Sequence, residues 1–209
     1  MFVWPRLFSH VPPELTDHYE PDRPWRLLGF PLDALLRDSW RHIDGSAFIH
    51  DTAVIEGRVW IGRDCRIGPH SYLRDGCYIG NGARVGASCE LKRAILLPDA
   101  TVPHLSYVGD SILGARVNLG AGTILSNWRH DAGLISIRDL DGEIHDTGRT
   151  KLGAVLGDGV KTGCNAVISP GTIIGANTMI YPLVSLRGGA YPEEMIIKLR
   201  QQQDIVPMR

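Results

Sequence analysis

The sequence predicts an all-β protein, a parallel β-helix built from hexapeptide repeats, and three observations carry this prediction. Aliphatic residues recur at every sixth position from Ile43 to Leu91 without a miss. A small or short residue follows four positions after each of them up to Val85. Glycine often follows the aliphatic residue directly, where a corner can use its conformational freedom. Neither an α-helix nor an ordinary strand repeats at six, and the period-two alternation and hairpin turns of a sandwich or barrel occur in one place only.

The repeat defines a central domain over residues 43–186, which loses phase between Leu97 and Leu113 and is interrupted over 128–151. Three hexapeptides make one triangular coil, so residues separated by three hexapeptides should stack on neighbouring coils at an inter-strand spacing of about 4.8 Å. Three of the four cysteines occupy the small inward position and are expected to be core thiols: Cys65, Cys77 and Cys89.

Residues 1–42 form an N-terminal extension rich in proline, with one short helix expected over 32–40 that could cap the open coil. The interruption at 128–151 contains Asp141-Gly142 between two short apolar stretches, which is a hairpin signal. We expect it to form an arm that projects from one edge of the β-helix.

Residues 187–209 are expected to form a C-terminal helix and a tail. Pro192 suits a helix start, and Met195, Ile196 and Leu199 fall on one face of a helix over 191–203. Such a helix could close the last coil.

The charge balance excludes some classes of partner. Lysine and arginine number 22 against 23 aspartate and glutamate, a net charge of -1, so no basic field is present for nucleic acid or anionic membranes. The stretch from Met1 to Phe30 has no apolar run long enough for a signal peptide or a membrane span, which predicts a cytoplasmic protein. The four cysteines show no C-x-x-C spacing, so we expect reduced thiols.

One candidate binding site follows from the stacking rule. Arg74 and Lys92 are separated by three hexapeptides and should lie side by side on adjacent coils. Two cations about 5 Å apart repel each other unless an anion lies between them, and an arginine with a lysine suits a phosphate. The alternative is a solvated pair balanced by Glu90 or Asp75, and spacing alone leaves both interpretations open.

A second candidate cluster lies where the repeat loses phase, because irregular chain on a regular solenoid is where binding groups collect. His104 could act as a general base near neutral pH, and Asn118 and Asn127 can both donate and accept hydrogen bonds. A lone histidine is more often structural, so the residues alone leave the role of His104 open.

Two motifs carry a resemblance to a known family. The segments HLSYVGD (104–110) and NLGAGTI (118–124), followed by Asn127, resemble the acetyltransferase half of the bifunctional UDP-N-acetylglucosamine pyrophosphorylase/glucosamine-1-phosphate N-acetyltransferase family. The segment DTGRTKLGA (146–154) and the arm before it resemble the archaeal-type and related sugar-nucleotidyltransferase branch. The resemblance covers about residues 43–186.

The resemblance implies a left-handed coil, a homotrimer with sites between subunits, and acetyl-CoA as cosubstrate, with no metal needed for acetyl transfer. It assigns roles position by position: His104 as general base, Arg74, Lys92 and Tyr107 at the sugar phosphate, Asn118 and Asn127 at the sugar and the thioester, and Ala121 and Cys164 at acetyl-CoA.

The chain also departs from the family. Residues 1–42 contain no glycine-rich nucleotide loop, so we expect no nucleotidyl transfer, and a separate nucleotidyltransferase is a conceivable partner. Gly133 and Ser136 stand where lysines are expected, although Arg129 and Arg138 are nearby.

The function expected from these observations is N-acetyl transfer from acetyl-CoA to an amino-sugar 1-phosphate similar to glucosamine 1-phosphate. The alternative is a non-catalytic scaffold that binds a sugar nucleotide or a phosphate. A zinc enzyme of the carbonic-anhydrase kind would need three convergent histidines, and the sequence has no His-x4-His pair.

Overall fold

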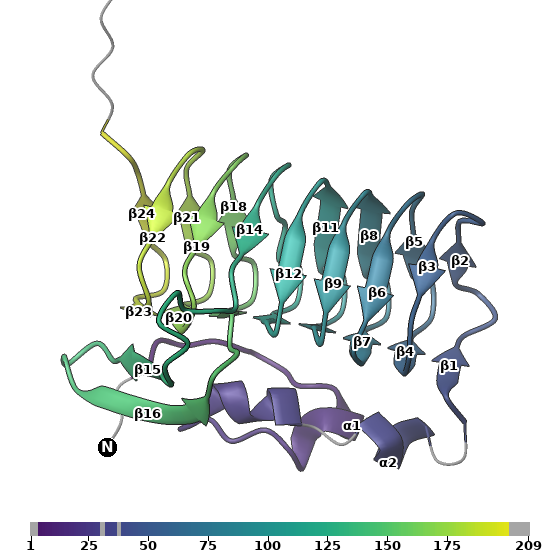
Figure 1. Cartoon of the computed structure of the whole chain (residues 1–209), viewed down its shortest axis with the longest axis horizontal. Helices are drawn as coiled ribbons and strands as arrows, with labels where there is room; N and C mark the ends of the chain where they lie inside the picture. Colours follow the sequence, from purple (N-terminus) through teal and green to yellow (C-terminus); the bar gives the residue numbers. More distant parts are fainter. Residues whose placement is uncertain (1–3, 30–31, 37–38, 201–209) are drawn as a thin grey trace, which may run out of the picture.

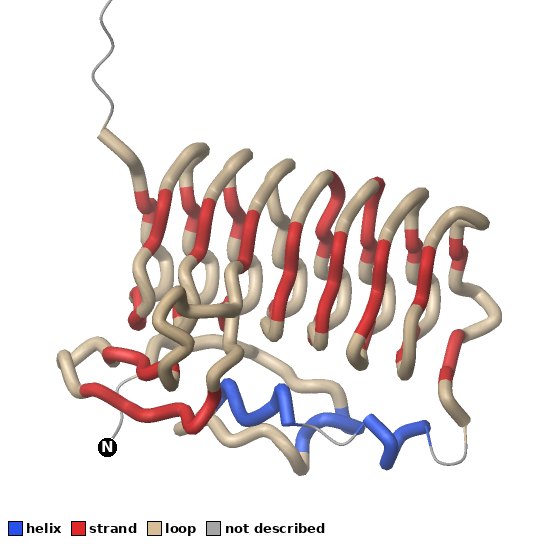
Figure 2. The backbone as a smooth tube through the Cα atoms, viewed as in Figure 1, coloured by secondary structure: helices blue, strands red, loops and turns tan. Residues whose placement is uncertain are grey.

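The protein is a parallel β-helix, seen in a computed structural model that describes residues 4–29, 32–36 and 39–200 (Figure 1). Short parallel strands follow one another around each coil, and the coils stack along one axis (Figure 2). This architecture confirms the fold class that the hexapeptide period predicts, and it is consistent with the left-handed coil that the resemblance implies.

Three sheets form the sides of the solenoid. Sheet A contains β1 (Arg41–Ile43), β4 (Val59–Ile61), β7 (Cys77–Ile79), β10 (Ile95–Leu96), β13 (Ile112–Leu113), β17 (Ala154–Leu156), β20 (Thr172–Ile174) and β23 (Gly189–Tyr191). Sheet B contains β2 (Phe48–Ile49), β5 (Arg66–Ile67), β8 (Arg84–Ala87) and β11 (Thr101–His104), then β18 (Lys161–Thr162), β21 (Met179–Ile180) and β24 (Ile196–Ile197). Sheet C contains β3 (Val54–Ile55), β6 (Tyr72–Arg74), β9 (Glu90–Lys92), β12 (Tyr107–Gly109), β14 (Ile124–Leu125), β19 (Val167–Ile168) and β22 (Ser185–Leu186).

The aliphatic repeat positions form the core of the solenoid. Ile61, Ile67 and Leu73, one from each sheet of the same coil, are almost completely buried. Neighbouring coils are first offset by three full hexapeptides, as predicted, and then by one residue less from the pairing of Tyr78 with Ile95 up to the arm. Three residues separate Arg74 from Tyr78, but only two separate their register partners Lys92 and Ile95, so the corner after β9 is one residue shorter and the six-residue period loses phase there.

The N-terminal extension lies along the outer face of sheet A (Figure 1). It contains α1 (Pro13–Thr16), the 3-10 helix η1 (Pro24–Gly29) and α2 (Leu32–Leu36). Its apolar side chains and the outward-facing side chains of sheet A bury one another: Leu7, Leu15, Trp25, Leu27 and Leu28 on the extension, and Tyr78, Ile95, Ile112, Val155 and Ile173 on the sheet. This second core gives the extension its place.

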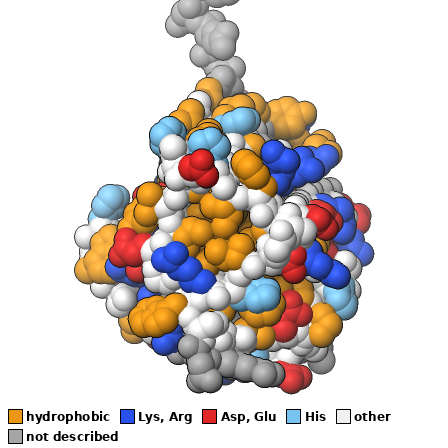
Figure 3. Space-filling view, turned by 90° about the vertical axis from the view of Figure 1, so that its right-hand side faces the viewer, with side chains coloured by type: hydrophobic (Ala, Val, Ile, Leu, Met, Phe, Trp, Pro, Cys, Tyr) orange, Lys and Arg blue, Asp and Glu red, His pale blue; other side chains and the backbone are white. Residues whose placement is uncertain are grey.

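The short helix expected over 32–40 is present as α2, but it lies against sheet A at β4 and does not cap the open coil. The described helix ends at Leu36, and positions 37 and 38 lie outside the described residues. The end of the solenoid beyond β1 to β3 instead presents apolar side chains at its centre (Figure 3), with Ile43 and Phe48 exposed. The helix is held at the side because sheet A offers it an apolar face.

The inserted arm is the hairpin that the sequence predicts, formed by β15 (Ile135–Arg138) and β16 (Ile144–Arg149) in antiparallel pairing. The arm does not stand clear of the solenoid but packs against it. Ile135 and Ile137 are buried in the second core, beside Leu152. The alternation of buried and exposed residues along β15 gives this strand one apolar face, which packs next to β23.

The predicted C-terminal helix is wrong over the described part of 191–203, and its last residues, 201–203, lie outside the described residues. Ile196 and Ile197 instead form β24, which pairs in parallel with Met179 and Ile180 of β21. Among the described residues no helix is long and apolar enough to cross a bilayer.

Candidate functional site

A cavity of about 270 Å³ opens on the outer face of sheet C and is called the cation cavity below. It is lined by Arg74, Lys92, Tyr107, Asn127, Trp128 and Lys151. The first two of these residues are direct register partners on β6 and β9, as the stacking rule predicts. Four of the eight predicted site residues thus meet in one cavity with three positive charges.

Carboxylates already balance the cations of this cavity. A guanidinium nitrogen of Arg74 lies 2.7 Å from Glu90 and another lies 3.3 Å from Asp75. The Lys92 ammonium lies 3.4 Å from the same oxygen of Asp75. The hydrogen bond to Glu90 raises the pKa of Arg74, so this cation stays charged. Both carboxylates that the sequence offered as balancing groups, Glu90 and Asp75, therefore pair with these cations, and the Asp75 side chain is 39% exposed.

Asp110 fixes the inner wall of the cavity, and the sequence analysis gave it no role. Its carboxylate is fully buried, and it lies 3.4 Å from the Lys92 ammonium and 3.4 Å from the Arg93 guanidinium. It also accepts a hydrogen bond from the Asn127 side-chain amide. A buried carboxylate with three such partners holds Lys92 and Asn127 in fixed positions.

Gly109 allows the two polar ends of the cavity to approach each other. A Cβ at this position would lie 2.6 Å from the Tyr107 hydroxyl and 2.7 Å from the Asn127 amide. Burial raises the pKa of Tyr107, and the charges of Glu90 and Asp110 act in the same direction. The phenol is therefore a neutral donor near neutral pH.

Lys151 and Trp128 were missed because the arm brings them together. They pair across an antiparallel bridge where the arm leaves and rejoins the solenoid. The Lys151 ammonium lies 5.4 Å from the Trp128 ring centroid. Lys151 thus adds a third cation to the cavity at the point where the arm rejoins the solenoid.

The arm residues that the sequence analysis discussed do not line the cation cavity. Gly133 and Ser136 belong to the arm and do not line it. Arg129 is paired with Asp131, and Arg138 donates to the carbonyl of Gly142 at the hairpin turn. Lys151 is the arm-related cation at the cavity.

The other predicted residues form a second group, along the corner between sheets B and C. The amide of Gly122 donates to the carbonyl of His104, and the amide of Asn165 donates to the carbonyl of Ala121. His104, Ala121 and Cys164 thus stack on successive coils, about 4.8 Å apart. We call these three residues the corner column.

Asn118 lies close to the corner column, on the sheet B side. It forms parallel bridges with Thr101 of β11 and Lys161 of β18, and so joins the two parts of sheet B. Asn118 and Cys164 are exposed.

The corner column and the cation cavity lie on different sides of one chain. His104 ends β11 in sheet B, whereas Tyr107 begins β12 in sheet C shortly afterwards. The His104 side chain is exposed, and within the described part of the chain its imidazole makes no hydrogen bond. The cavity does not include it.

Comparisons with known proteins identify the repeat. The family described as bacterial transferase hexapeptide (six repeats) matches residues 58–93 and 153–188. A bifunctional sugar-1-phosphate nucleotidylyltransferase/acetyltransferase from Sulfurisphaera tokodaii is 43% identical, over 76% of this chain and 45% of its own length. A bifunctional protein GlmU from Rippkaea orientalis is 35% identical, over 59% of this chain and 23% of its own.

Among solved structures, the UDP-N-acetylglucosamine acyltransferase of Francisella novicida is 15% identical, with a TM-score of 0.42, over 76% of this chain and 66% of that chain. The chain spans less than half the length of the curated relatives named above. The sequence matches confirm the resemblance drawn from the motifs. Residues 58–93 and 153–188 thus match the hexapeptide-repeat family, and the chain is a homologue of part of the sugar-1-phosphate nucleotidylyltransferase/acetyltransferases.

Proposed function

We propose that this protein transfers an acetyl group from acetyl-CoA to the amine of an amino-sugar 1-phosphate. The observation that carries the proposal is the cation cavity, in which Arg74, Lys92 and Lys151 surround a space of about 270 Å³ beside two neutral polar side chains. Three cations around a small cavity suit a phosphate, and neighbouring donors suit sugar hydroxyl groups.

The phosphate end of the acceptor would replace Asp75 between Arg74 and Lys92. Asp110 would keep the Lys92 ammonium and the Asn127 amide in place during this exchange, because its carboxylate is buried and bound to both. The Tyr107 hydroxyl, which stays protonated, would donate to a sugar or phosphate oxygen.

The thioester end would lie along the corner column. The acceptor amine attacks the thioester carbonyl carbon, the carbon-sulfur bond breaks, and CoA leaves as the thiol. His104 would take the proton from the amine and return it to the departing sulfur. Backbone amides near Ala121 would stabilise the oxyanion of the tetrahedral intermediate.

A homotrimer would bring the two halves of this site together. The corner column of one copy would face the cation cavity of the next, which accounts for their separation on a single chain. The relatives are bifunctional by name, so a nucleotidyltransferase that supplies or consumes the sugar phosphate is a fitting partner.

The test is a thiol-release assay with acetyl-CoA and a panel of amino-sugar phosphates. We expect His104→Ala to reduce turnover at least about a hundredfold, the scale for loss of a general base. Sedimentation should show the same oligomer for the variant and the wild type. Turnover at the wild-type level in His104→Ala would refute the assignment of the base.

A second function is favoured by one observation, the distance of the His104 side chain from the cation cavity on a single chain. In that case the protein binds sugar phosphates or sugar nucleotides without catalysis. Calorimetry separates the two functions, because binding of both glucosamine 1-phosphate and acetyl-CoA without thiol release would identify the scaffold.

A further inference from the structure

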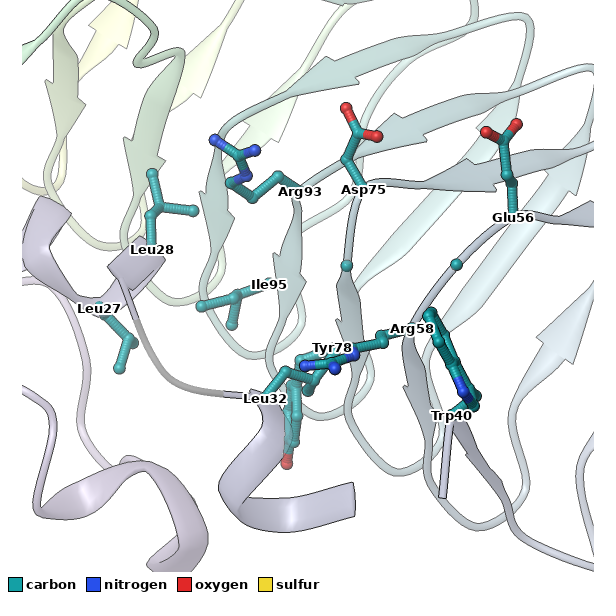
Figure 4. A pocket seen from close by; sticks show the side chains of 12 residues that line it. Leu27, Leu28, Leu32, Trp40, Glu56, Arg58, Asp75, Tyr78, Arg93 and Ile95 are labelled. Atoms are coloured by element: carbon teal, nitrogen blue, oxygen red, sulfur yellow. The ribbon is translucent and has the colours of Figure 1, made fainter. Parts of the chain in front are cut away.

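A second and larger cavity adjoins the cation cavity and has no part in the function proposed above. Its volume is about 390 Å³, and it lies where the N-terminal extension crosses the outer face of sheet A (Figure 4). Leu27, Leu28 and Leu32 of the extension lie on one side of it, and Tyr78 and Ile95 of the sheet on the other. We call it the extension cavity.

The interior of the extension cavity suits a flat aromatic group. Leu27, Leu28, Leu32 and Ile95 form an apolar floor, while charged side chains line the rest of the cavity. The Tyr78 hydroxyl is occupied by a hydrogen bond of 2.6 Å to Glu14. Trp40 lies at the edge of the cavity and is 68% exposed, and the Arg58 guanidinium lies 5.3 Å from the centroid of its ring. A planar ring can stack on indole or guanidinium, as nucleobases do.

The two cavities share one wall. Asp75 lines the extension cavity, and its carboxylate also pairs with Arg74 and Lys92 of the cation cavity. Arg93 lines the extension cavity as well, and it binds the same buried Asp110 that holds Lys92.

The charged groups of this wall are arranged for a linking anion. The carboxylates of Asp75 and Glu56 point away from the apolar floor of the extension cavity (Figure 4). The Arg93 side chain is 44% exposed and only one of its guanidinium nitrogens bonds to Asp110, so it has further donors for a ligand. Cations thus line both cavities on either side of Asp75, with Arg93 in the extension cavity and Arg74 and Lys92 in the cation cavity. A diphosphate that displaced Asp75 would have a guanidinium on one side and the Arg74 and Lys92 pair on the other.

We propose that the extension cavity binds the nucleoside end of a nucleoside-diphosphate-linked amino sugar. The base stacks beside Trp40, the diphosphate crosses the Asp75 wall, and the sugar occupies the cation cavity. The inference rests on the proposed function for the sugar end, and it makes the acceptor a nucleotide sugar in place of a free sugar 1-phosphate.

The test is calorimetry on the full chain with UDP, dTDP, GDP, glucosamine 1-phosphate and inorganic phosphate. At least one nucleoside diphosphate should bind at least about tenfold more tightly than inorganic phosphate, and Trp40→Ala should remove most of that gain, since stacking on an aromatic ring contributes on this scale. The same variant should bind glucosamine 1-phosphate as the wild type does. Phe48→Ala is the matched control, because Phe48 is 50% exposed and also lies under an arginine, Arg66, but on sheet B.

The outcomes separate this inference from the proposed function. The inference alone is overturned if the protein acetylates glucosamine 1-phosphate but binds nucleoside diphosphates no more tightly than inorganic phosphate. The same holds if Trp40→Ala leaves the binding of nucleoside diphosphates unchanged. If nucleoside diphosphates require Trp40 for binding but do not compete with glucosamine 1-phosphate, one ligand does not span both cavities, and the inference is wrong. Competitive binding through Trp40 without acetyl transfer to any acceptor supports the inference and contradicts the proposed function.

Discussion

Replacing Asp75 by asparagine should strengthen the binding of a sugar phosphate in the cation cavity, although Asp75 lies in the wall between this cavity and the extension cavity. Its carboxylate lies 3.3 Å from Arg74 and 3.4 Å from Lys92, so an incoming phosphate must break both pairs. Each pair is worth about 1 kcal/mol at the dielectric constant of water, and Asp75 is exposed enough for this limit to apply. Removing the charge should therefore improve binding by about 1 to 2 kcal/mol, or about 5- to 30-fold.

The assay is calorimetric titration of glucosamine 1-phosphate at low and high salt. The gain should shrink at high salt, since exposed charges are screened. Asn tolerates the left-handed backbone of position 75, where φ is 57°, so the corner keeps its shape. Asp51→Asn is the control for net charge, because Asp51 is exposed on the first coil away from the cavity. Equal or weaker binding by Asp75→Asn would refute the reasoning and make Asp75 a positioning residue.

Three further predictions concern other parts of the structure. Lys151→Met should weaken glucosamine 1-phosphate binding about tenfold by calorimetry through loss of one charged hydrogen bond, whereas Lys161→Met on sheet B should not. Only Cys164 should react with Ellman's reagent at pH 8 in the folded protein, because it is exposed while burial raises the pKa of Cys65 and Cys77 to about 11 and also raises that of Cys89. Acetyl-CoA should slow the reaction of Cys164. Fast reaction of a second thiol would contradict the burial of the other three. The hydrogen bond from His145 lowers the pKa of Asp139. The ionised Asp139 therefore stabilises the fold above the ordinary carboxyl pKa of 3.8, and this stabilisation is lost as the pH falls through the lowered pKa. In thermal melts Asp139→Asn should lose less stability than the wild type on acidification, and equal losses would count against this pairing.

The solenoid and half of the site were predictable from the sequence, because residues separated by the length of one coil lie side by side on neighbouring strands. Arg74 and Lys92 lie side by side because one coil contains three hexapeptides and the residue before each of them, Leu73 and Leu91, faces the core. The same reasoning places His104 above Ala121 once the shorter offset of these coils is known. That offset arises because the corners after β9 and β12, counted between register partners, are each one residue shorter than the corner after β6. A corner carries too weak a sequence pattern to locate the missing residue.

The arm and the extension depend on contacts that have no period. Lys151 reaches Trp128 because the chain between them closes on itself, and the length of an insertion does not predict where its ends meet. For the extension, a signal did exist in the outward positions of sheet A. Tyr78, Ile95 and Ile112 are apolar where a solvent-facing sheet would be polar, and they recur once in each successive coil. Such a stripe indicates a covered face.

The C-terminal segment shows why one pattern of apolar residues led to the wrong element. Met195, Ile196 and Leu199 suit one face of a helix, but Ile197 also falls next to Ile180 in the core of the solenoid. A short isolated helix is marginal in water, whereas β21 offers ready backbone partners to an added strand. The buried Thr178 hydroxyl donates to the carbonyl of Pro192 and accepts from the amide of Met195, which satisfies the corner before β24. The open edge of the solenoid therefore decides the structure of this segment, because it pairs backbone groups that a short helix would have to pair alone.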